Sequence, residues 1–379
     1  MTTPFSSVHL PLTFPMAEKP MLKIGFIPLL DCIPLVIAKE LAFFAEAGLD
    51  VSLSREASWA SIRDKVKFGL LDAAQMPAGI VLASGMGLGA SQPMVTAIGL
   101  GQNGNAITAS NPLYDALNPQ NLSMNSESAA TALKSYLKTS DSELTIASVH
   151  TYSTHHFLLR DWLNHYNIDP ENKIRQIVVP PPQMVDAMER GMIDLFCAGE
   201  PWNSIAQIHQ VGHKLLSGHQ IWENAPDKVL GVTKEWHNHH PYTHQRLISA
   251  ILKACLWLDD EKNKRLGFQL LHDSHYMDID LGNINLMLGK HRFSPPSATF
   301  PWLSQASWFT RHIRNLHQLP DTETSAGNTY LTGVYRKVAE LMKLNTPSAD
   351  AKAEGIHSES WVINGTQEPI EMPPDMRFR

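Results

Sequence analysis

The sequence predicts an α/β protein built from two similar lobes. The main observation is a pattern that occurs twice: a short strand, a loop, a helix, a Gly-x-x-Asp turn, a second short strand and a proline. It occupies residues 51–77 and again residues 177–201. Open α/β sheets bind ligands at the carboxyl ends of their strands, so two such lobes facing each other would form a cleft. The pattern alone leaves an alternative open, an ordinary β-α-β crossover used twice.

The second copy of the pattern shows why these residues form these elements. Residues 177–179 are apolar and predict a buried strand, which ends at three prolines because proline has no N–H for the ladder. A helix is expected over residues 183–190, and Gly191 supplies the left-handed residue that ends it. Asp194 then opens a short strand. In the first copy, Gly69 and Asp72 have the same spacing.

Strands and helices alternate along most of the chain, which predicts mostly parallel sheets. The expected strands are residues 22–27, 51–53, 73–76, 94–100, 106–109, 144–149, 177–179 and 195–198. The expected helices are residues 33–47, 61–68, 77–85, 129–138, 155–166, 183–190, 245–258, 261–271, 305–316 and 330–344.

This order of elements predicts the domain organisation. Residues 22–110 and 216–300 are expected to form the first lobe, and residues 111–215 the second. Residues 1–21 would be an N-terminal arm, and residues 301–344 would be helices packing on the first lobe. The polar, proline-rich residues 345–379 predict an irregular tail.

Composition and charge exclude several classes of protein. The chain has 379 residues, 43% hydrophobic and 18% charged, which is ordinary for a globular protein. A formal net charge of −6 gives no basic footprint for nucleic acid, so any anion site must be locally positive. Cys32, Cys197 and Cys255 are scattered in apolar contexts and predict buried thiols.

The sequence also predicts a cytoplasmic protein. Residues 1–20 contain four prolines and lack the features of a signal peptide. Residues 29–32 resemble a lipoprotein cleavage site, but Asp31 stands where a small residue is needed. No run reaches the roughly 18 apolar residues of a membrane span.

Several motifs together resemble one family of solute receptors. The start of the chain, Ile24-Gly25-Phe26-Ile27-Pro28-Leu29 and Gly48-Leu49-Asp50-Val51, looks like the start of type II periplasmic-binding-protein folds. More specific are Ala57-Ser58-Trp59, Thr154-His155, the run from Val178 to Met184, and Gly199-Glu200-Pro201-Trp202-Asn203. This combination is similar to the nitrate- and bicarbonate-binding proteins of the NrtA/CmpA family, over roughly residues 22–315. The resemblance implies two lobes around a ligand cleft, with a helical C-terminal extension.

The resemblance also implies a function. Without an evident lipoprotein signal, the chain is most similar to the NasS-like cytoplasmic sensors of nitrate and nitrite. Such a sensor has no catalytic activity and no cofactor. Its implied partner is a NasT-like, ANTAR-type RNA-binding antiterminator, held inactive until the anion binds. The resemblance therefore implies nitrate or nitrite as ligand, with no direct contact to nucleic acid or membrane. The alternative is the solute-binding component of a nitrate ABC transport system.

Two candidate ligand-binding residues lie at an expected helix N-terminus. Trp59 carries an indole N–H donor, and backbone N–H groups at a helix start favour anions. The family motif places a ligand-contacting tryptophan here, and the backbone N–H of Ala60 would join it. Packing is the alternative role for a loop tryptophan.

Three further candidates come from the family motifs. Asn105 falls where nitrate receptors of the family carry a glutamine, so its amide is one methylene shorter. His155 matches the histidine of the Thr-His motif, and tighter binding at mildly acidic pH is expected if it contacts the anion. Pro181 matches a ligand-contacting proline. A structural or exposed role is the alternative for His155.

The last candidate is Lys228, which aligns with the nitrate-pairing lysine of the family. An acidic residue occupies this position in the bicarbonate branch, where a metal helps binding, so Lys228 favours nitrate or nitrite without metal. Lys228→Ala is expected to lower affinity by roughly 2–5 kcal/mol if the amine is buried against the anion. A solvated loop lysine is the alternative.

Two other clusters carry weaker signals. His240 and His244 have the i, i+4 spacing of a metal site, but Pro241 interrupts the helix, so no metal is predicted. Glu200 has no nucleophile or second acid beside it in the sequence, which leaves it at the cleft rim. An enzyme such as a pyrimidine synthase of thiamine metabolism would carry a cysteine-rich motif that this chain lacks.

Overall fold

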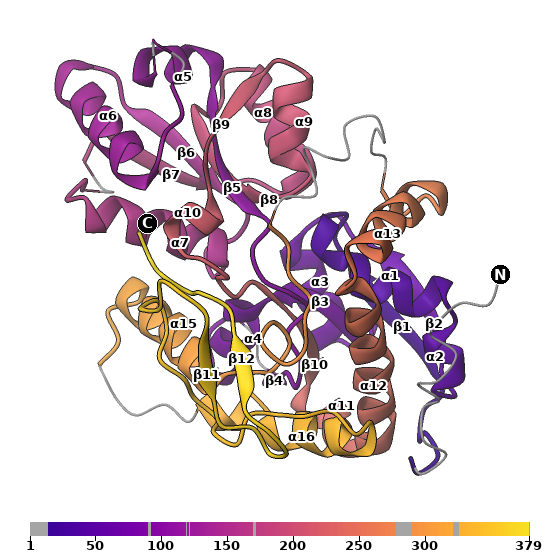
Figure 1. The fold of residues 1–379 in the computed structure, drawn as a ribbon. Helices are drawn as coiled ribbons and strands as arrows, with labels where there is room; N and C mark the ends of the chain where they lie inside the picture. Colours follow the sequence, from indigo (N-terminus) through magenta and orange to yellow (C-terminus); the bar gives the residue numbers. More distant parts are fainter. Residues whose placement is uncertain are drawn as a thin grey trace.

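Two five-stranded sheets divide the protein into a lower and an upper lobe (Figure 1). The computed structural model describes residues 14–89, 92–118, 120, 122–169, 172–277, 290–320 and 326–378. Most of the expected N-terminal arm, residues 1–13, therefore lies outside the described residues.

The sheet of the lower lobe, lobe 1, combines the start of the chain with a strand that returns late. Its strand order is β2-β1-β3-β10-β4. The strands are β1 (Met21–Phe26), β2 (Asp50–Arg55), β3 (Ala73–Pro77), β4 (Met94–Val95) and β10 (Lys228–Thr233). The helices are α1 (Ile33–Glu40), α2 (Phe43–Glu46), α3 (Trp59–Lys67), α4 (Ala78–Gly85), α11 (Lys234–His239), α12 (Pro241–Leu258) and α13 (Glu261–Asp273), with the 3₁₀ turn η1 (Leu30–Cys32).

The sheet of the upper lobe, lobe 2, comes from one continuous part of the chain. Its strand order is β7-β6-β8-β5-β9. The strands are β5 (Asn105–Ser110), β6 (Leu144–Ser148), β7 (Ile174–Val178), β8 (Leu195–Gly199) and β9 (Gly212–Ser217). The helices are α5 (Asn111–Leu117), α6 (Ser126–Thr139), α7 (Thr154–His165), α8 (Met184–Glu189), α9 (Trp202–Ile208) and α10 (Gly218–Ile221), with η2 (Pro181–Gln183).

The two Gly-x-x-Asp turns have the same geometry in both lobes. Gly69 and Gly191 adopt φ values of +71° and +67°, the left-handed region that glycine tolerates. The side chain of Asp72 accepts the backbone N–H of Lys23 at 2.9 Å. The side chain of Asp194 accepts that of Thr145 at 2.8 Å. In each lobe the carboxylate thus ties the start of one strand, β3 or β8, to its parallel neighbour, β1 or β6, as expected for two similar units.

The sheets are mixed rather than mostly parallel, which corrects the sequence-based expectation. β10 runs antiparallel to β3 and β4, and β5 runs antiparallel to β8 and β9. The chain enters β5 from lobe 1 and β10 from lobe 2. Neither strand is therefore joined to its sheet neighbours by a right-handed crossover helix. The alternation of strands and helices along the chain does not reveal this exchange.

The points at which the chain changes lobe also differ from the expected boundaries. The sequence predicted changes after residues 110 and 215, but β5 and β9 both belong to the sheet of lobe 2. The first crossover is the loop before β5, residues 101–104, and the second is residues 222–227 before β10.

Two helices follow the segment of the chain that returns to lobe 1. α15 (Leu303–Leu316) packs on α4, and α16 (Thr332–Leu341) packs on α12, both in lobe 1. α15 also contacts α7 of lobe 2, where the ring of Phe157 stacks on His312 at 4.9 Å. The C-terminal helices therefore touch both lobes.

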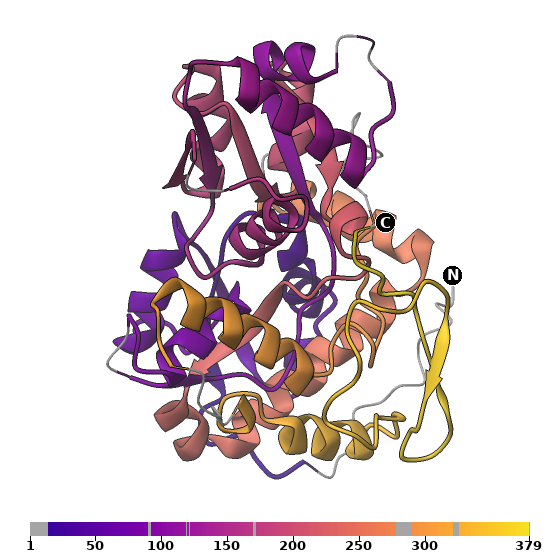
Figure 2. The ribbon, with the colours of Figure 1, turned by 90° about the vertical axis from the view of Figure 1, so that its left-hand side faces the viewer.

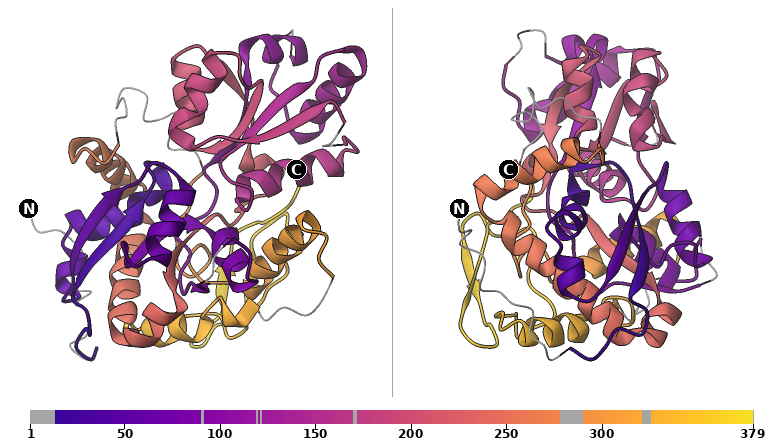
Figure 3. Two further views of the ribbon diagram at one scale, coloured as in Figure 1. Left: turned by 180° about the vertical axis from the view of Figure 1, so that it is seen from behind. Right: turned by 90° about the vertical axis from the view of Figure 1, so that its right-hand side faces the viewer.

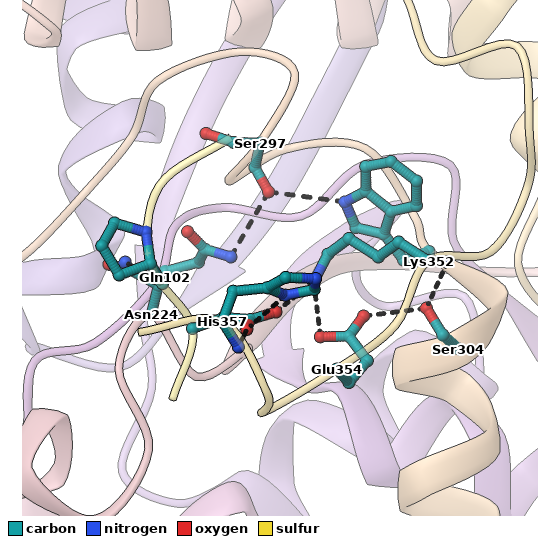
Figure 4. Close-up of polar contacts among 10 residues, drawn as sticks. Gln102, Asn224, Ser297, Ser304, Lys352, Glu354 and His357 are labelled. Atoms are coloured by element: carbon teal, nitrogen blue, oxygen red, sulfur yellow. Dashed lines mark hydrogen bonds and ion pairs between the residues drawn. The ribbon is translucent and has the colours of Figure 1, made fainter. Parts of the chain in front are cut away.

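The C-terminal tail has regular structure, although the sequence predicted an irregular one. Strands β11 (Trp361–Ile363) and β12 (Ile370–Met372) form an antiparallel hairpin. Lys352 pairs with Glu354 at 2.6 Å and Asp375 at 3.2 Å, and His357 pairs with Asp375 at 2.9 Å (Figure 4). Buried ion pairs thus fix the tail where the sequence shows only polar residues and prolines.

The end of the tail lies along the second crossover. Asn224 donates to the carbonyl of Pro374 at 2.6 Å, and the N–H of Glu223 donates to the carbonyl of Met376 at 2.9 Å. Figures 2 and 3 show the tail (yellow) running from lobe 1 to the C-terminus at lobe 2. There Phe378 stacks on His165 with ring centroids 3.8 Å apart. The tail therefore joins both lobes beside their connection.

Arg377→Ala is expected to lower the stability of the protein. The guanidinium lies 3.8 Å from the ring centroid of Trp222 and 5.6 Å from that of Trp308. Loss of this partly buried cation–π contact should lower the free energy of unfolding by about 1–2 kcal/mol, measured by urea denaturation. Arg190→Ala is the control, because the Arg190 side chain is 69% exposed and its ion pair contributes little. Equal stability of the two variants would contradict the role given to Arg377.

Candidate functional site

The candidate site lies between the lobes, at the ends of elements from both. Asp31 belongs to η1, which follows β1, and Trp59 is the first residue of α3. His155 is the second residue of α7, Asn105 opens β5, and Lys228 opens β10. The first two come from lobe 1, the next two from lobe 2, and Lys228 follows directly on the second crossover.

Distances bring these residues into one cluster. The amine of Lys228 lies 5.5 Å from the ring centroid of Trp59 and 3.1 Å from Asp31 Oδ2. His155 Nε2 lies 4.0 Å from Asp227 Oδ2. Gly199 is the strand partner of Asn105, and a Cβ at Gly199 would be 3.5 Å from His155 Nε2 and 3.8 Å from Asp31 Oδ2. Gly199 on β8 therefore lies beside both His155 and Asp31, and Asn105 is paired to Gly199 on the neighbouring strand.

Helix capping explains how Trp59 and His155 are positioned. Ser58 accepts the N–H of Ser61 at 3.1 Å, and Ser153 accepts that of His156 at 3.2 Å. These N-caps begin the two helices at fixed residues and direct the next side chains into the space between the lobes. Both candidates thus lie at helix N-termini, where the backbone favours negative charge.

A buried charged triad forms the floor of the site. Lys228 is 1% exposed, and its amine lies 2.6 Å from Asp227 Oδ2 and 3.1 Å from Asp31 Oδ2. Although burial opposes the charged amine, the carboxylates of Asp227 and Asp31 outweigh it and raise the pKa of Lys228. Lys228 is therefore a charged residue held by two acidic partners.

Both oxygens of Asp31 act as acceptors in this arrangement, as those of an ionised carboxylate do. Gln75 accepts the N–H of Ile27 through its carbonyl oxygen at 3.0 Å, so its amide N–H₂ group faces Asp31 and donates to Oδ1. The other oxygen accepts from Lys228, so both carboxylate oxygens are acceptors. Burial, followed by the charge of Asp227, raises the pKa of Asp31, and the lysine opposes that rise.

Three of the candidate ligand-binding side chains have polar atoms without a hydrogen-bond partner among the described residues. They are the indole N–H of Trp59, both amide atoms of Asn105 and both ring nitrogens of His155. These residues are 1%, 4% and 0% exposed, so water does not replace the missing partners from bulk solvent. Buried polar groups are normally paired, which makes this set of donors and acceptors a candidate site for a ligand.

His155 is neutral in the empty site. Burial lowers the pKa of His155 well below its ordinary value, and the charge of Lys228 lowers it further, while Asp31 opposes them. A neutral imidazole offers one N–H donor and one acceptor nitrogen.

The structure brings four of the six residues selected from the sequence together. Trp59, Asn105, His155 and Lys228 form the cluster. Ala60 follows Trp59 in α3 with an exposed side chain, which leaves only its backbone N–H as a possible contact. Pro181 is buried at the start of η2, and its contact with the ligand stays a prediction.

Sequence reasoning missed three residues of the site: Asp31, Gln75 and Asp227. The signal for Asp31 was available, since a single carboxylate in the apolar run Leu29–Ile33 rarely becomes buried without a partner. Asp227 precedes Lys228 directly, but adjacency in sequence did not indicate an ion pair.

Metal binding, thiol chemistry and a catalytic role for Glu200 have little support in the structure. Across the ranges that the structure describes, no three His, Cys, Asp or Glu side chains lie close enough to hold a metal ion. His244 instead lies 2.9 Å from His237 through their Nδ1 atoms. Burial raises the pKa of the thiols of Cys32, Cys197 and Cys255, so they are protonated and unreactive at neutral pH. Glu200 pairs with Lys214 at 2.7 Å.

The two-lobed fold and this site agree with the comparison to known proteins. A model of the NMT1-like family matches residues 16–272. The chain belongs to the NMT1-like family. Its relatives place it among the nitrate- and bicarbonate-binding solute proteins of that family. It is 31% identical to the nitrate/nitrite binding protein NrtA of Nostoc over 322 residues, covering 79% of this chain and 72% of NrtA.

Two other family members have higher identity but are much longer. The chain is 37% identical to the nitrate import ATP-binding protein NrtC of Synechocystis, over 78% of this chain and 46% of NrtC. It is also 37% identical to the bicarbonate transport ATP-binding protein CmpC of Synechococcus elongatus, over 80% of this chain and 46% of CmpC. The chain thus spans about half the length of these relatives.

The solved structures show the fold. The periplasmic nitrate-binding protein NrtA of Synechocystis superposes with a TM-score of 0.80 at 24% identity, covering 95% of this chain and 97% of that one. The alkanesulfonate-binding protein SsuA of Xanthomonas axonopodis has a TM-score of 0.61. The expected type II periplasmic-binding-protein fold is therefore confirmed for this member of the family.

Lys228→Ala is expected to destabilise the protein even without ligand. Removing the amine leaves Asp31 and Asp227 buried without their cation, which should lower the free energy of unfolding by about 3–5 kcal/mol. Denaturation in urea measures this loss. The triple variant Lys228→Met, Asp31→Asn, Asp227→Asn removes all three charges and should recover most of the lost stability. An unchanged midpoint for Lys228→Ala would contradict the triad.

Proposed function

We propose that this protein binds nitrate or nitrite between its lobes and acts as a sensor of that anion. The observation that carries the proposal is the set of buried donors without partners on Trp59, Asn105 and His155. Nitrate and nitrite have only acceptor atoms, and they are small enough for a dry site between two helix N-termini. Donors from both lobes would hold the anion and the lobes together.

The burial of the site supports binding by closure. Trp59, Asn105, His155 and Lys228 are each at most 4% exposed, so an anion can enter only when the lobes move apart. The N–H of Leu30 donates to the carbonyl of Glu200 at 2.9 Å, which joins lobe 1 to lobe 2 in the closed form. An anion that binds this form better than the open one would shift the population toward closure.

As a sensor, the protein would pass this change to a partner. We propose a NasT-like, ANTAR-type RNA-binding antiterminator as that partner, released or modulated when the lobes close, in the control of nitrate assimilation. The net charge of −6 supports RNA contact by the partner rather than by this chain. The anion can change partner binding only by the difference in its affinity for the free and the complexed protein. We propose a cytoplasmic location and no catalytic activity.

A second candidate function is the solute-binding part of a nitrate import system. The names of NrtA and NrtC among the relatives favour it. In the described ranges, no helix is both long and apolar enough to cross a membrane. Isolation of the protein from cells with its bound partners separates the two candidates: an antiterminator supports the sensor, and a transport ATPase supports the import system.

Calorimetric titration with nitrate, nitrite and bicarbonate, each with and without a divalent metal, tests the ligand. Binding of nitrate or nitrite that does not depend on metal is the expected result. Binding of bicarbonate alone, or of none of the three, would contradict the proposal.

Gly79→Ala is expected to weaken anion binding by opposing closure. Gly79 lies on α4 of lobe 1, and a Cβ there would be 2.1 Å from the backbone oxygen of Tyr152 in lobe 2. Relieving this overlap should require about 1–3 kcal/mol, which corresponds to a roughly 5- to 150-fold loss of nitrate affinity by calorimetry. Gly333→Ala on α16 is the control, since its Cβ would meet nothing within 4 Å. Equal affinities for the two variants would show that closure does not contribute to binding.

A further inference from the structure

The charges in the site present a problem for any anion. Asp31, Asp227 and Lys228 are buried together with a neutral His155, so these four side chains have a net charge of −1. A bound monoanion would make the total −2 in a buried space, where like charges repel strongly. The donors alone do not remove this repulsion.

The unpaired atoms show where one compensating proton fits. Asp227 Oδ1 is a buried acceptor with no hydrogen-bond partner among the described residues. Asp227 Oδ2 lies 4.0 Å from His155 Nε2, which is also unpaired. A protonated His155 would have two N–H donors, so it could face Asp227 with one and the anion with the other.

We propose that nitrate binds together with one proton, which His155 takes up beside Asp227. This inference rests on the proposed function and goes beyond it by assigning the coupling. Nitrate and proton enter as a neutral pair, so the net charge of the site stays at −1. In this scheme Asp227 determines the pH dependence of binding, because its negative charge is the one that the proton on His155 offsets.

The charged groups around His155 are consistent with this assignment. Lys228 faces it from the start of β10, Asp227 from the end of the second crossover, and Asp31 from η1. His291 also acts on Asp31, whose two oxygens already accept hydrogen bonds from Gln75 and Lys228. Asp31 therefore has no free oxygen for the proton. Burial and the charge of Lys228 keep the pKa of His155 low, so a proton on His155 needs the added negative charge of the anion.

The sign of the pH dependence follows. Uptake of one proton on binding raises the association constant as pH falls, by up to tenfold per unit between the pKa of His155 in the empty site and its higher pKa in the complex. Nitrate does not titrate near neutral pH, so the protein alone is the source of the dependence. Wild-type affinity should rise about tenfold per unit over at least one unit between pH 8 and pH 5.

Two variants test the roles of the pair. Asp227→Asn removes the charge that requires the proton and gives the empty site a net charge of zero, so its affinity at pH 8 should match that of the wild type at low pH, without a slope. His155→Gln keeps a donor but cannot be protonated, so it should bind weakly at every pH. His219→Gln is the control, since His219 pairs with Glu223 at 3.4 Å outside the site, and it should keep the wild-type slope.

Calorimetry of nitrate binding in buffers of different ionisation enthalpy counts the protons directly. The expected result is close to one proton taken up by the wild type and none by Asp227→Asn. Tight nitrate binding with no proton uptake from pH 5 to 8, or a slope retained in Asp227→Asn, would overturn this inference and leave the proposed function intact. The absence of any nitrate binding at every pH would refute the proposed function itself.

Discussion

The buried ion triad of Asp31, Lys228 and Asp227 is the constraint on which the site depends. The three residues come from three places in the fold. Asp31 lies in the 3₁₀ turn after β1, Lys228 is the first residue of β10, and Asp227 is the last residue of the second crossover. Taking three charges out of water is unfavourable unless they pair with good geometry. Because two carboxylates surround one amine, the triad both holds the crossover against lobe 1 and fixes the electrostatics that a ligand meets.

The connection between the lobes carries a second set of constraints. Two crossovers exchange β5 and β10 between the sheets, and the end of the tail lies along the second of them. Asn103 and Asn224, one on each crossover, are hydrogen bonded at 2.8 Å and both adopt positive φ. Any relative motion of the lobes must pass through these residues. The tail contacts Asn224 through Pro374 and His165 through Phe378. When the lobes move, it must therefore move with them or lose these contacts.

The fold was largely predictable from sequence because its signals are local. The two Gly-x-x-Asp turns, with Asp72 and Asp194 at the same spacing, indicated two similar units. The exchange of β5 and β10 was not predictable, since strand direction depends on which lobe a strand joins. Family resemblance selected Trp59, Asn105, His155 and Lys228, which the structure brings together. Asp31 was not selected, because its partner Lys228 is 197 positions away in the sequence. Long-range pairing of charges leaves no periodic trace in a sequence.

The central claim is that donors from both lobes hold the anion in one buried site. A crystal structure of the protein with nitrate tests it most directly. The account predicts a planar anion between the lobes, within hydrogen-bond distance of Trp59 Nε1, Asn105 Nδ2 and a ring nitrogen of His155, with Lys228 still paired to Asp31. An anion bound elsewhere, with these three side chains still lacking a ligand, would contradict it.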